Sequence, residues 1–223
     1  MNTKHRVTRG KRETVFPAAF TLVELLVVIT LIAMLSALMV PSLQGLLGVA
    51  GRRGGANALA GVLEQARLSA IESGASAFVG FPPSSTLSSE AAVSSVIVYR
   101  ATTAAEQATN GSKLFAPVTK WQRLPKSVYL DPASIVAAAD RSDSVSGLLP
   151  LLDGKALTTI SSLEFDRFGK VPGDPNADRT LKVGEGVFNA GAVTFKRSTN
   201  DYCALKVYPM TGRVRITDGL TKP

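Results

Sequence analysis

The sequence predicts an α+β fold, in which a long N-terminal α-helix packs against an antiparallel β-sheet head. Three observations predict it: a nearly uncharged run at residues 20–50, apolar residues at helical spacing within 51–75, and short β-branched or aromatic runs between turn residues from 76 onward. The chain has 223 residues, enough for a helical stalk and one domain of ordinary size. Its composition, 45% hydrophobic and 19% charged, excludes global disorder, because disordered chains are apolar-poor and charge-rich.

The first helical segment has the length and polarity of a membrane span. Residues 20–40 number 21, enough to cross a hydrocarbon core of about 30 Å, and Glu24 is the one charged residue between 20 and 50. Five basic residues precede the run and two follow it soon, so the positive-inside rule places the N-terminus in the cytoplasm and the head outside. A charge at the centre of a membrane helix costs about 2.5 to 3.5 kcal/mol, so Glu24 calls for a partner.

Two simpler interpretations of the N-terminus compete with this one. A secretory signal peptide cleaved after Ala50 would need an apolar core of about 7 to 15 residues, and this run is longer. A plain one-pass anchor fits the length but leaves Glu24 unexplained.

The segment 19–29, which reads AFTLVELLVVI behind a basic leader, resembles the prepilin cleavage and methylation motif of type IV pilins and type II secretion pseudopilins. The resemblance implies that a prepilin peptidase cuts between Ala19 and Phe20 and methylates the new amino terminus. It also implies that Glu24 attracts the amino terminus of a neighbouring subunit during assembly. Ala19 stands where the family usually has glycine. Pro41 lies where pilin-like helices commonly carry a proline that kinks the helix.

The same resemblance implies the function, partners and location of the chain. It would be a minor pilin or pseudopilin, a structural subunit of a type II secretion or type IV pilus-like apparatus, with no cofactor and no enzymatic activity. Its partners would be the prepilin peptidase, other pilin or pseudopilin subunits, the inner-membrane assembly platform and the lipid bilayer. It would cross the inner membrane once, with a periplasmic or extracellular head, before extraction into a pilus or pseudopilus. The head carries, in this order, the short motifs WQRL at 121–124, FDRFG at 165–169 and GRVR at 212–215. Their order resembles that in minor pseudopilins of the H type and in fimbrial T-type proteins.

Four segments follow from these patterns: a cleaved basic leader at 1–19, a transmembrane and assembly helix at 20–50, its amphipathic continuation at 51–75 and an antiparallel β head at 76–223. The continuation is predicted to end near Gly74. Repeated glycines between 45 and 61 predict a stretch of low helix stability, because glycine disfavours a helix interior. The apolar residues at helical spacing in the continuation are Leu59, Val62, Leu63, Ala66 and Ala70.

Strands are predicted where β-branched or aromatic residues cluster, at 77–79, 96–99, 128–130, 163–165 and 193–196. The clearest hairpin pairs 203–208 with 213–217 through a turn at 209–212. Alternation turns Cys203, Leu205 and Val207 inward against Val214 and Ile216. The same alternation turns Lys206, Arg213 and Arg215 outward. Residues 82–85 and 133–147 are predicted to be loops.

Catalytic and metal-binding motifs find little support. The sequence has no nucleophile elbow and no P-loop, and its one histidine, His5, lies in the leader, so Cys203 would have no imidazole base in the processed chain. No metal site is predicted. The nearest candidate has Asp174, Asn176 and Asp178 at alternating positions and Glu185 at the twelfth position of a calcium loop, but Arg179 stands in place of the required glycine. The alternative is a polar turn held by Asx hydrogen bonds.

The positive charge of the chain has two sources. The formal net charge is +8; the leader carries +4 of it, and the residues from 193 onward carry the other +4. Arg213 and Arg215, one strand step apart, could contact successive phosphates. In the fimbrial T-type relatives a Gly-Arg-x-Arg ending is linked to DNA capture, so the alternative function is a DNA-binding minor pilin. The plain alternative is a charged strand edge that resists aggregation.

Overall fold

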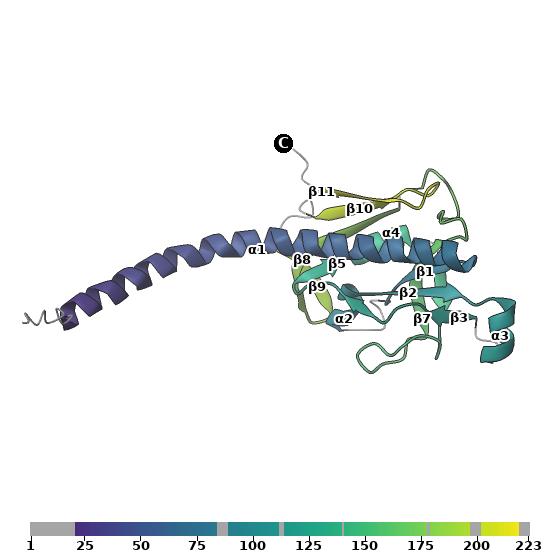
Figure 1. The fold of residues 1–223 in the computed structure, drawn as a ribbon, viewed down its shortest axis with the longest axis horizontal. Helices are drawn as coiled ribbons and strands as arrows, with labels where there is room; N and C mark the ends of the chain where they lie inside the picture. Colours follow the sequence, from purple (N-terminus) through teal and green to yellow (C-terminus); the bar gives the residue numbers. More distant parts are fainter. Residues whose placement is uncertain are drawn as a thin grey trace, which may run out of the picture. The chain divides into compact units, whose positions relative to one another are not determined.

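The computed structural model describes residues 21–83, 89–111, 114–139, 141–177, 179–196 and 202–218, without the side chains of 37–50, 110 and 218. The chain divides into two compact units, Met1–Gly45 and Leu46–Pro223. The second unit combines the C-terminal part of helix α1 (Leu22–Ser73) with two antiparallel sheets and three short helices, which confirms the predicted α+β class (Figure 1).

Helix α1 contains 52 residues and has a defined start and end. The hydroxyl oxygen of Thr21 accepts a hydrogen bond from the backbone N–H of Glu24 at 3.2 Å, which satisfies one of the free donors of the first turn. The helix ends at Ser73, and Gly74 follows with φ of 64°, the left-handed conformation typical of a helix C-terminus. The end near Gly74 is as predicted.

The described part of the chain contains no helix long and apolar enough to span a membrane. Of the predicted span at 20–40, Phe20 and the side chains of residues 37–40 lie outside the described residues.

Six strands form one antiparallel sheet in the order β3-β2-β1-β7-β6, with β4 pairing to β2. Five strands form a second antiparallel sheet in the order β11-β10-β8-β5, with β9 pairing to β8. The sequence predicts a single sheet, so the division into two sheets is a correction. The strands of the first sheet are β1 (Ala77–Phe81), β2 (Ser95–Ala101), β3 (Phe115–Pro117), β4 (Gln122–Arg123), β6 (Arg141–Ser144) and β7 (Thr159–Phe165). Those of the second are β5 (Val128–Leu130), β8 (Arg179–Asn189), β9 (Ala192–Phe195), β10 (Cys203–Val207) and β11 (Val214–Asp218).

Three short helices interrupt the strands: α2 (Glu90–Ser94), α3 (Ala104–Asn110) and α4 (Pro132–Ala138). The loop predicted at 133–147 is therefore wrong, because it contains most of α4 and all of β6. Asp131 caps α4 by accepting a hydrogen bond from the N–H of Ala133, and Pro132 occupies a first-turn position where a missing N–H costs nothing. The polar residues of β6 form a strand because they pair with β7.

One apolar core lies under α1 and reaches both sheets. The predicted stripe is buried, with Leu59, Leu63, Ala66 and Ala70 each at 0% exposure. It packs with residues of β1, β2 and β7 from the first sheet and of β5, β8 and β10 from the second. Figure 1 shows this part of α1 running along the head between the strands of the two sheets. Burial of one leucine side chain stabilises a fold by about 1.5 to 3 kcal/mol, so this shared stripe is a large term in the stability of the head.

The glycine-rich stretch before this core is helical and has a packing role that the sequence does not predict. A Cβ on Gly55 would lie 2.6 Å from Cγ1 of Val128 in β5 and 3.5 Å from Val183 in β8. A Cβ on Gly54 would meet nothing within 4 Å. Gly55 thus lets the helix backbone approach the second sheet, whereas Gly54 faces open space.

These neighbouring glycines provide a matched pair of variants. Gly55→Ala is expected to destabilise the full-length chain in detergent by about 1 to 3 kcal/mol, because the new methyl group overpacks against Val128. Gly54→Ala is expected to be neutral or to stabilise by up to about 1 kcal/mol, because alanine favours the helix. Urea denaturation of both variants measures the difference, and equal effects would contradict the close approach.

Candidate functional site

The N-terminal part of α1 exposes an apolar surface within its own unit. Glu24 lies exposed in the first turn, and the large apolar side chains around it have exposures between 41% and 81%. Ala19 and Phe20 lie outside the described residues, and Pro41 lies inside α1, with helical backbone on both sides. The exposed apolar residues are Leu22, Val23, Leu25, Leu26, Val27, Val28, Ile29, Leu31, Ile32, Met34 and Leu35.

Thr21 is a functional candidate that the sequence reasoning missed. Its spacing of three residues to Glu24 is the capping-box spacing, and its hydroxyl receives the N–H of Glu24. Because the N-terminal end of a helix favours negative charge, Glu24 also suits this position electrostatically. Thr21 therefore has a local role in starting α1, while this bond leaves the carboxylate of Glu24 out of the cap.

The predicted C-terminal hairpin is confirmed. β10 and β11 pair with Lys206 opposite Arg215 and Val207 opposite Val214. Cys203 is buried, as predicted, and Lys206, Arg213 and Arg215 are exposed.

The second sheet extends this exposed face beyond the hairpin. Lys182 of β8 pairs with Ala204 of β10 and shares the outward face, a cation the sequence reasoning missed because β8 was not predicted. Two aromatic rings accompany the lysines: Lys182 Nζ lies 4.7 Å from the centre of the Tyr202 ring, and Lys206 Nζ lies 6.0 Å from that of Tyr208. We call Lys182, Lys206, Arg213 and Arg215 the basic face. Arg197 and Lys222 lie outside the described residues.

Two turns that are distant in the sequence meet at the C-terminal end of α1. A Cβ on Gly212 would lie 1.9 Å from the carbonyl oxygen of Gly169, so the two backbones touch. Arg67 of α1 donates from Nε to the carbonyl oxygen of Thr211 at 3.0 Å. The N–H of Val171 donates to the carbonyl oxygen of Pro209 at 2.9 Å. The motifs at 165–169 and 212–215 therefore lie against each other. Their contacts, together with the bond from Arg67, hold the residues that precede β11 in place.

Comparison with known proteins gives a structural likeness only. No protein-family model and no curated protein matches the chain. Two crystal structures of the type IV minor pilin FimU from Pseudomonas aeruginosa are similar to it, each at 12% identity over 77% of this chain. Their TM-scores are 0.42 and 0.41, and the match covers 92% and 96% of the respective FimU chains.

The candidate calcium residues are not brought together by the described structure. Asp174 accepts the N–H of Asn176 at 2.9 Å, the Asx turn that the sequence offered as the alternative. Glu185 lies in the middle of β8 and pairs with Lys196 at 2.7 Å, and Asp178 lies outside the described residues. Across the described ranges, no group of three or more His, Cys, Asp or Glu residues is arranged to hold a metal ion.

A buried carboxylate joins three strands of the first sheet. Asp143, 3% exposed, accepts hydrogen bonds from the hydroxyl of Tyr99 at 2.7 Å, the hydroxyl of Ser162 at 2.8 Å and Nε of Arg141 at 2.6 Å. Burial, together with the hydrogen bond to Asp143, raises the pKa of Tyr99 well above its usual range. Tyr99 is therefore a fixed donor at neutral pH, and the group ties β2, β6 and β7 together. The sequence does not predict this group of hydrogen bonds, because β6 consists of polar residues and does not look like a strand.

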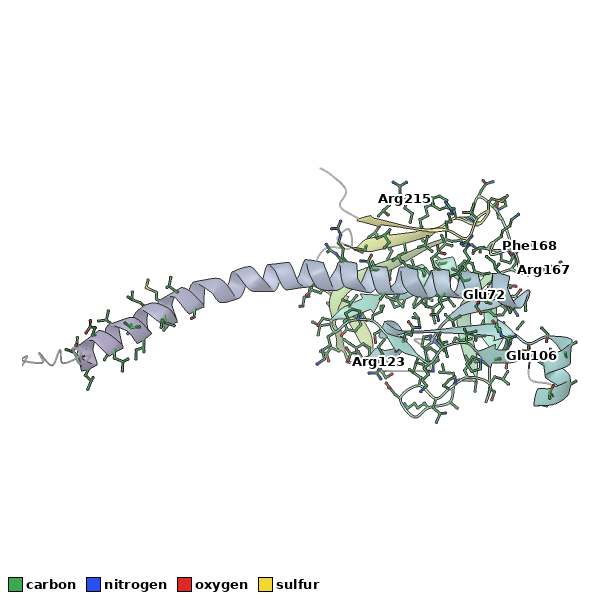
Figure 2. The ribbon with its side chains drawn as sticks, in the orientation of Figure 1. Glu72, Glu106, Arg123, Arg167, Phe168 and Arg215 are labelled. Carbon is green, nitrogen blue, oxygen red and sulfur yellow. The ribbon has the colours of Figure 1, made fainter. Side chains whose placement is uncertain are left out.

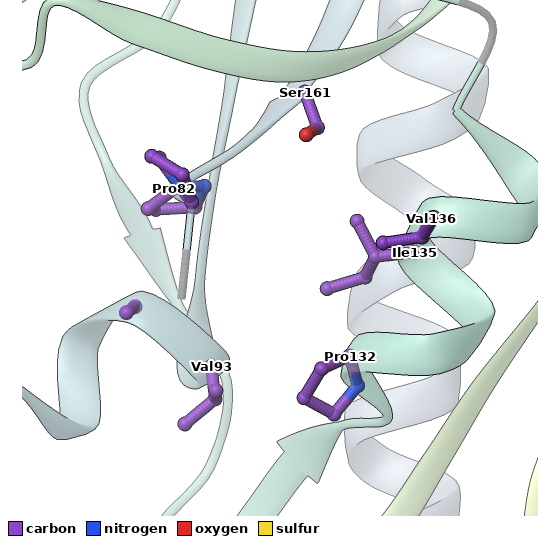
Figure 3. A pocket seen from close by; sticks show the side chains of 8 residues that line it. Pro82, Val93, Pro132, Ile135, Val136 and Ser161 are labelled. Carbon is purple, nitrogen blue, oxygen red and sulfur yellow. The ribbon is translucent and has the colours of Figure 1, made fainter. Parts of the chain in front are cut away.

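A pocket of about 130 Å³ opens between α2, α4 and the ends of β1 and β7 (Figure 3). The side chains that line it are apolar apart from the hydroxyl of Ser161. None of the lining residues is charged, so the lining supplies no acid or base to activate that hydroxyl. The lining residues are Pro82, Pro83, Ala92, Val93, Pro132, Ile135, Val136 and Ser161.

Calcium addition is expected to produce no binding heat and no rise in Tm, because Asp174 is engaged in its own turn and Glu185 is paired with Lys196. Calorimetric titration and thermal unfolding of the chain in detergent check this. A rise in Tm that Asp174→Ala abolishes would overturn it.

Proposed function

We propose that this chain is a minor pilin-like subunit, a structural component that is cleaved between Ala19 and Phe20 and assembles through its N-terminal helix. The observation that carries the proposal is the ordered segment 19–29 behind a basic leader, with Glu24 four residues after Phe20. The exposed apolar surface of α1 from Leu22 to Leu35 supports it, because such a surface requires a lipid or protein cover. The α+β head behind this helix is compatible with it.

The proposed apparatus is a type II secretion or type IV pilus-like system. The subunit would be held in the inner membrane, N-methylated by the prepilin peptidase and delivered to an assembly platform. Between helices in lipid, association depends on close packing and on polar pairing, and the proposed pair is the Glu24 carboxylate with a neighbour's amino terminus. A carboxylate exposed in the first turn suits this role, since its own chain leaves it accessible.

Glu24→Gln is expected to leave cleavage largely intact and to lower incorporation into assembled fibres by about tenfold or more, because it removes the charge and little else. Glu24→Asp, which keeps the charge, is the control. Cleavage is measured by mass spectrometry and incorporation by quantifying the sheared or cross-linked fibre fraction. Normal incorporation of Glu24→Gln would refute the assembly role, and an intact Met1 end or cleavage after Ala50 would refute the proposal as a whole.

The basic face favours a second candidate function, DNA binding by the assembled subunit. Arg213 and Arg215 lie exposed, and the described ion pairs include neither of them. Lys206 lies directly opposite Arg215, which widens the positive surface across two strands. Exposed cations at strand spacing suit a salt-sensitive contact with phosphates that does not depend on base sequence.

Arg213→Ala/Arg215→Ala is expected to weaken binding to a duplex DNA fragment by about tenfold or more and to reduce the salt slope by about two, because two phosphate contacts are lost. Lys120→Ala/Lys126→Ala removes the same charge from exposed positions outside β8, β10 and β11 and serves as the control. Gel-shift titration of the full-length chain at two salt concentrations measures both. An equal loss of DNA affinity in the two double variants would show that binding depends on net charge alone, and it would refute a specific contact at Arg213 and Arg215.

A further inference from the structure

The surface where the two turns meet the end of α1 carries several exposed apolar side chains. Phe168 is 66% exposed, Met210 61%, Leu68 51% and Ile71 44%. We call these four residues the turn platform. Ile71 reaches the turn at Gly169, whose Cβ would lie 2.8 Å from its Cδ1, and Leu68 lies three residues earlier on the same face of the helix. Phe168 and Met210 flank the touching residues of the two turns.

The platform is held by contacts that involve backbone atoms. The carboxylate of Asp166 accepts the N–H groups of Phe168 and Lys170 at 2.9 and 2.8 Å, which fixes the first turn. The N–H of Gly212 donates to the carbonyl oxygen of Tyr208 at 2.7 Å, which fixes the second. The apolar side chains are therefore displayed from a fixed scaffold, and ordering them on binding costs little entropy beyond their own rotamers.

Cations outnumber acids around the platform. Arg167 lies with Cζ 5.1 Å from the centre of the Phe168 ring, and Lys170 and Arg213 are exposed beside the two turns. No ion pair among the described residues uses any of these three cations. Figure 2 shows Arg167 and Phe168 at the end of α1 that carries Glu72. Arg67, at the base, is already paired with Glu64 at 3.4 Å.

The acidic side chains of the head are largely engaged inside the chain. Apart from Glu72, each acidic side chain described in the second unit accepts a hydrogen bond from within the molecule. These residues are Glu64, Glu90, Glu106, Asp131, Asp143, Asp153, Glu164, Asp166, Asp174 and Glu185. Among the described residues, a second copy of this head therefore offers the platform few free carboxylates, and its own cations would repel.

We propose that the turn platform docks a segment of a different protein, one that presents apolar side chains flanked by Asp or Glu. Phenylalanine, methionine and arginine are the residue types enriched at protein interfaces, where rigid anchors fill pockets of the partner. Complementary charge then selects an acidic partner over another copy. The inference goes beyond the proposed function, since it uses no residue of the N-terminal helix before Glu64.

Site-specific photo-cross-linking in cells that express the full-length chain from its own locus tests the proposal. A benzophenone amino acid replaces Phe168 or, separately, Met210, and Leu151, which is 61% exposed on another surface, serves as the matched control position. The expected result is an adduct with one different protein, mapped by mass spectrometry to a segment containing Asp or Glu. Its yield should exceed that at Leu151 by about tenfold.

Charge reversal separates a specific contact from proximity. Arg167→Glu should lower the adduct yield at Met210 by about tenfold, while Arg167→Lys should keep it. Replacing the mapped acidic residue of the partner by Lys should restore the yield with Arg167→Glu. Thermal unfolding of both variants should match that of the parent chain, because Arg167 is exposed and none of the ion pairs among the described residues includes it.

Several results would overturn the proposal: adducts only with a second copy, adducts only with lipid, a mapped segment without acidic residues, or yields no higher than at Leu151. An intact Met1 end or cleavage after Ala50 would refute the proposed function and leave this result untouched, because the adduct is read at the head.

Discussion

Both sheets of the head depend on the same apolar face of α1. Leu59, Leu63, Ala66 and Ala70 are fully buried against strands of each sheet, so neither sheet covers its inner surface without the helix. The approach is close enough that Gly55 has no room for a Cβ beside Val128. The helix therefore covers the inner face of both sheets, and Gly55 allows it to lie close to the second sheet.

The same arrangement places the functional candidates of the head. β7 belongs to the first sheet and the β10–β11 hairpin to the second, yet the turns that follow β7 and β10 touch at Gly169 and Gly212. They meet there because Arg67 of α1 bonds to the second turn and Ile71 packs on the first. The start of β11, and with it Arg213, is therefore positioned by the helix as well as by its own hairpin.

The sequence predicts best those elements whose side chains follow the period of their own backbone. The buried stripe of α1, its end near Gly74 and the inward and outward alternation of β10 and β11 are all read from spacing. The sequence does not predict β6 or β8, and the reason differs for each strand. β6 is polar because Asp143 forms a buried hydrogen-bond group, and β8 contains Gly184 and Gly186, whose Cβ positions would strike Phe195 and Thr194. Such features depend on neighbours distant in sequence, as does the division into two sheets.

Fold and surface charge are connected through the acidic residues. Asp131 caps α4, Asp143 joins three strands, and Asp166 and Asp174 hold turns, so these carboxylates act locally in forming the head. These carboxylates accept hydrogen bonds from backbone N–H groups and from buried side-chain donors that would otherwise have no partner. Lysine and arginine have long side chains and can extend their charges into water. The basic face is then in part a consequence of how the chain folds, because Lys182, Lys206 and Arg215 lie on the outward side of neighbouring strands whose inward residues are apolar. A partner recognised through that surface would meet groups already fixed by the same hydrogen bonds that hold the fold.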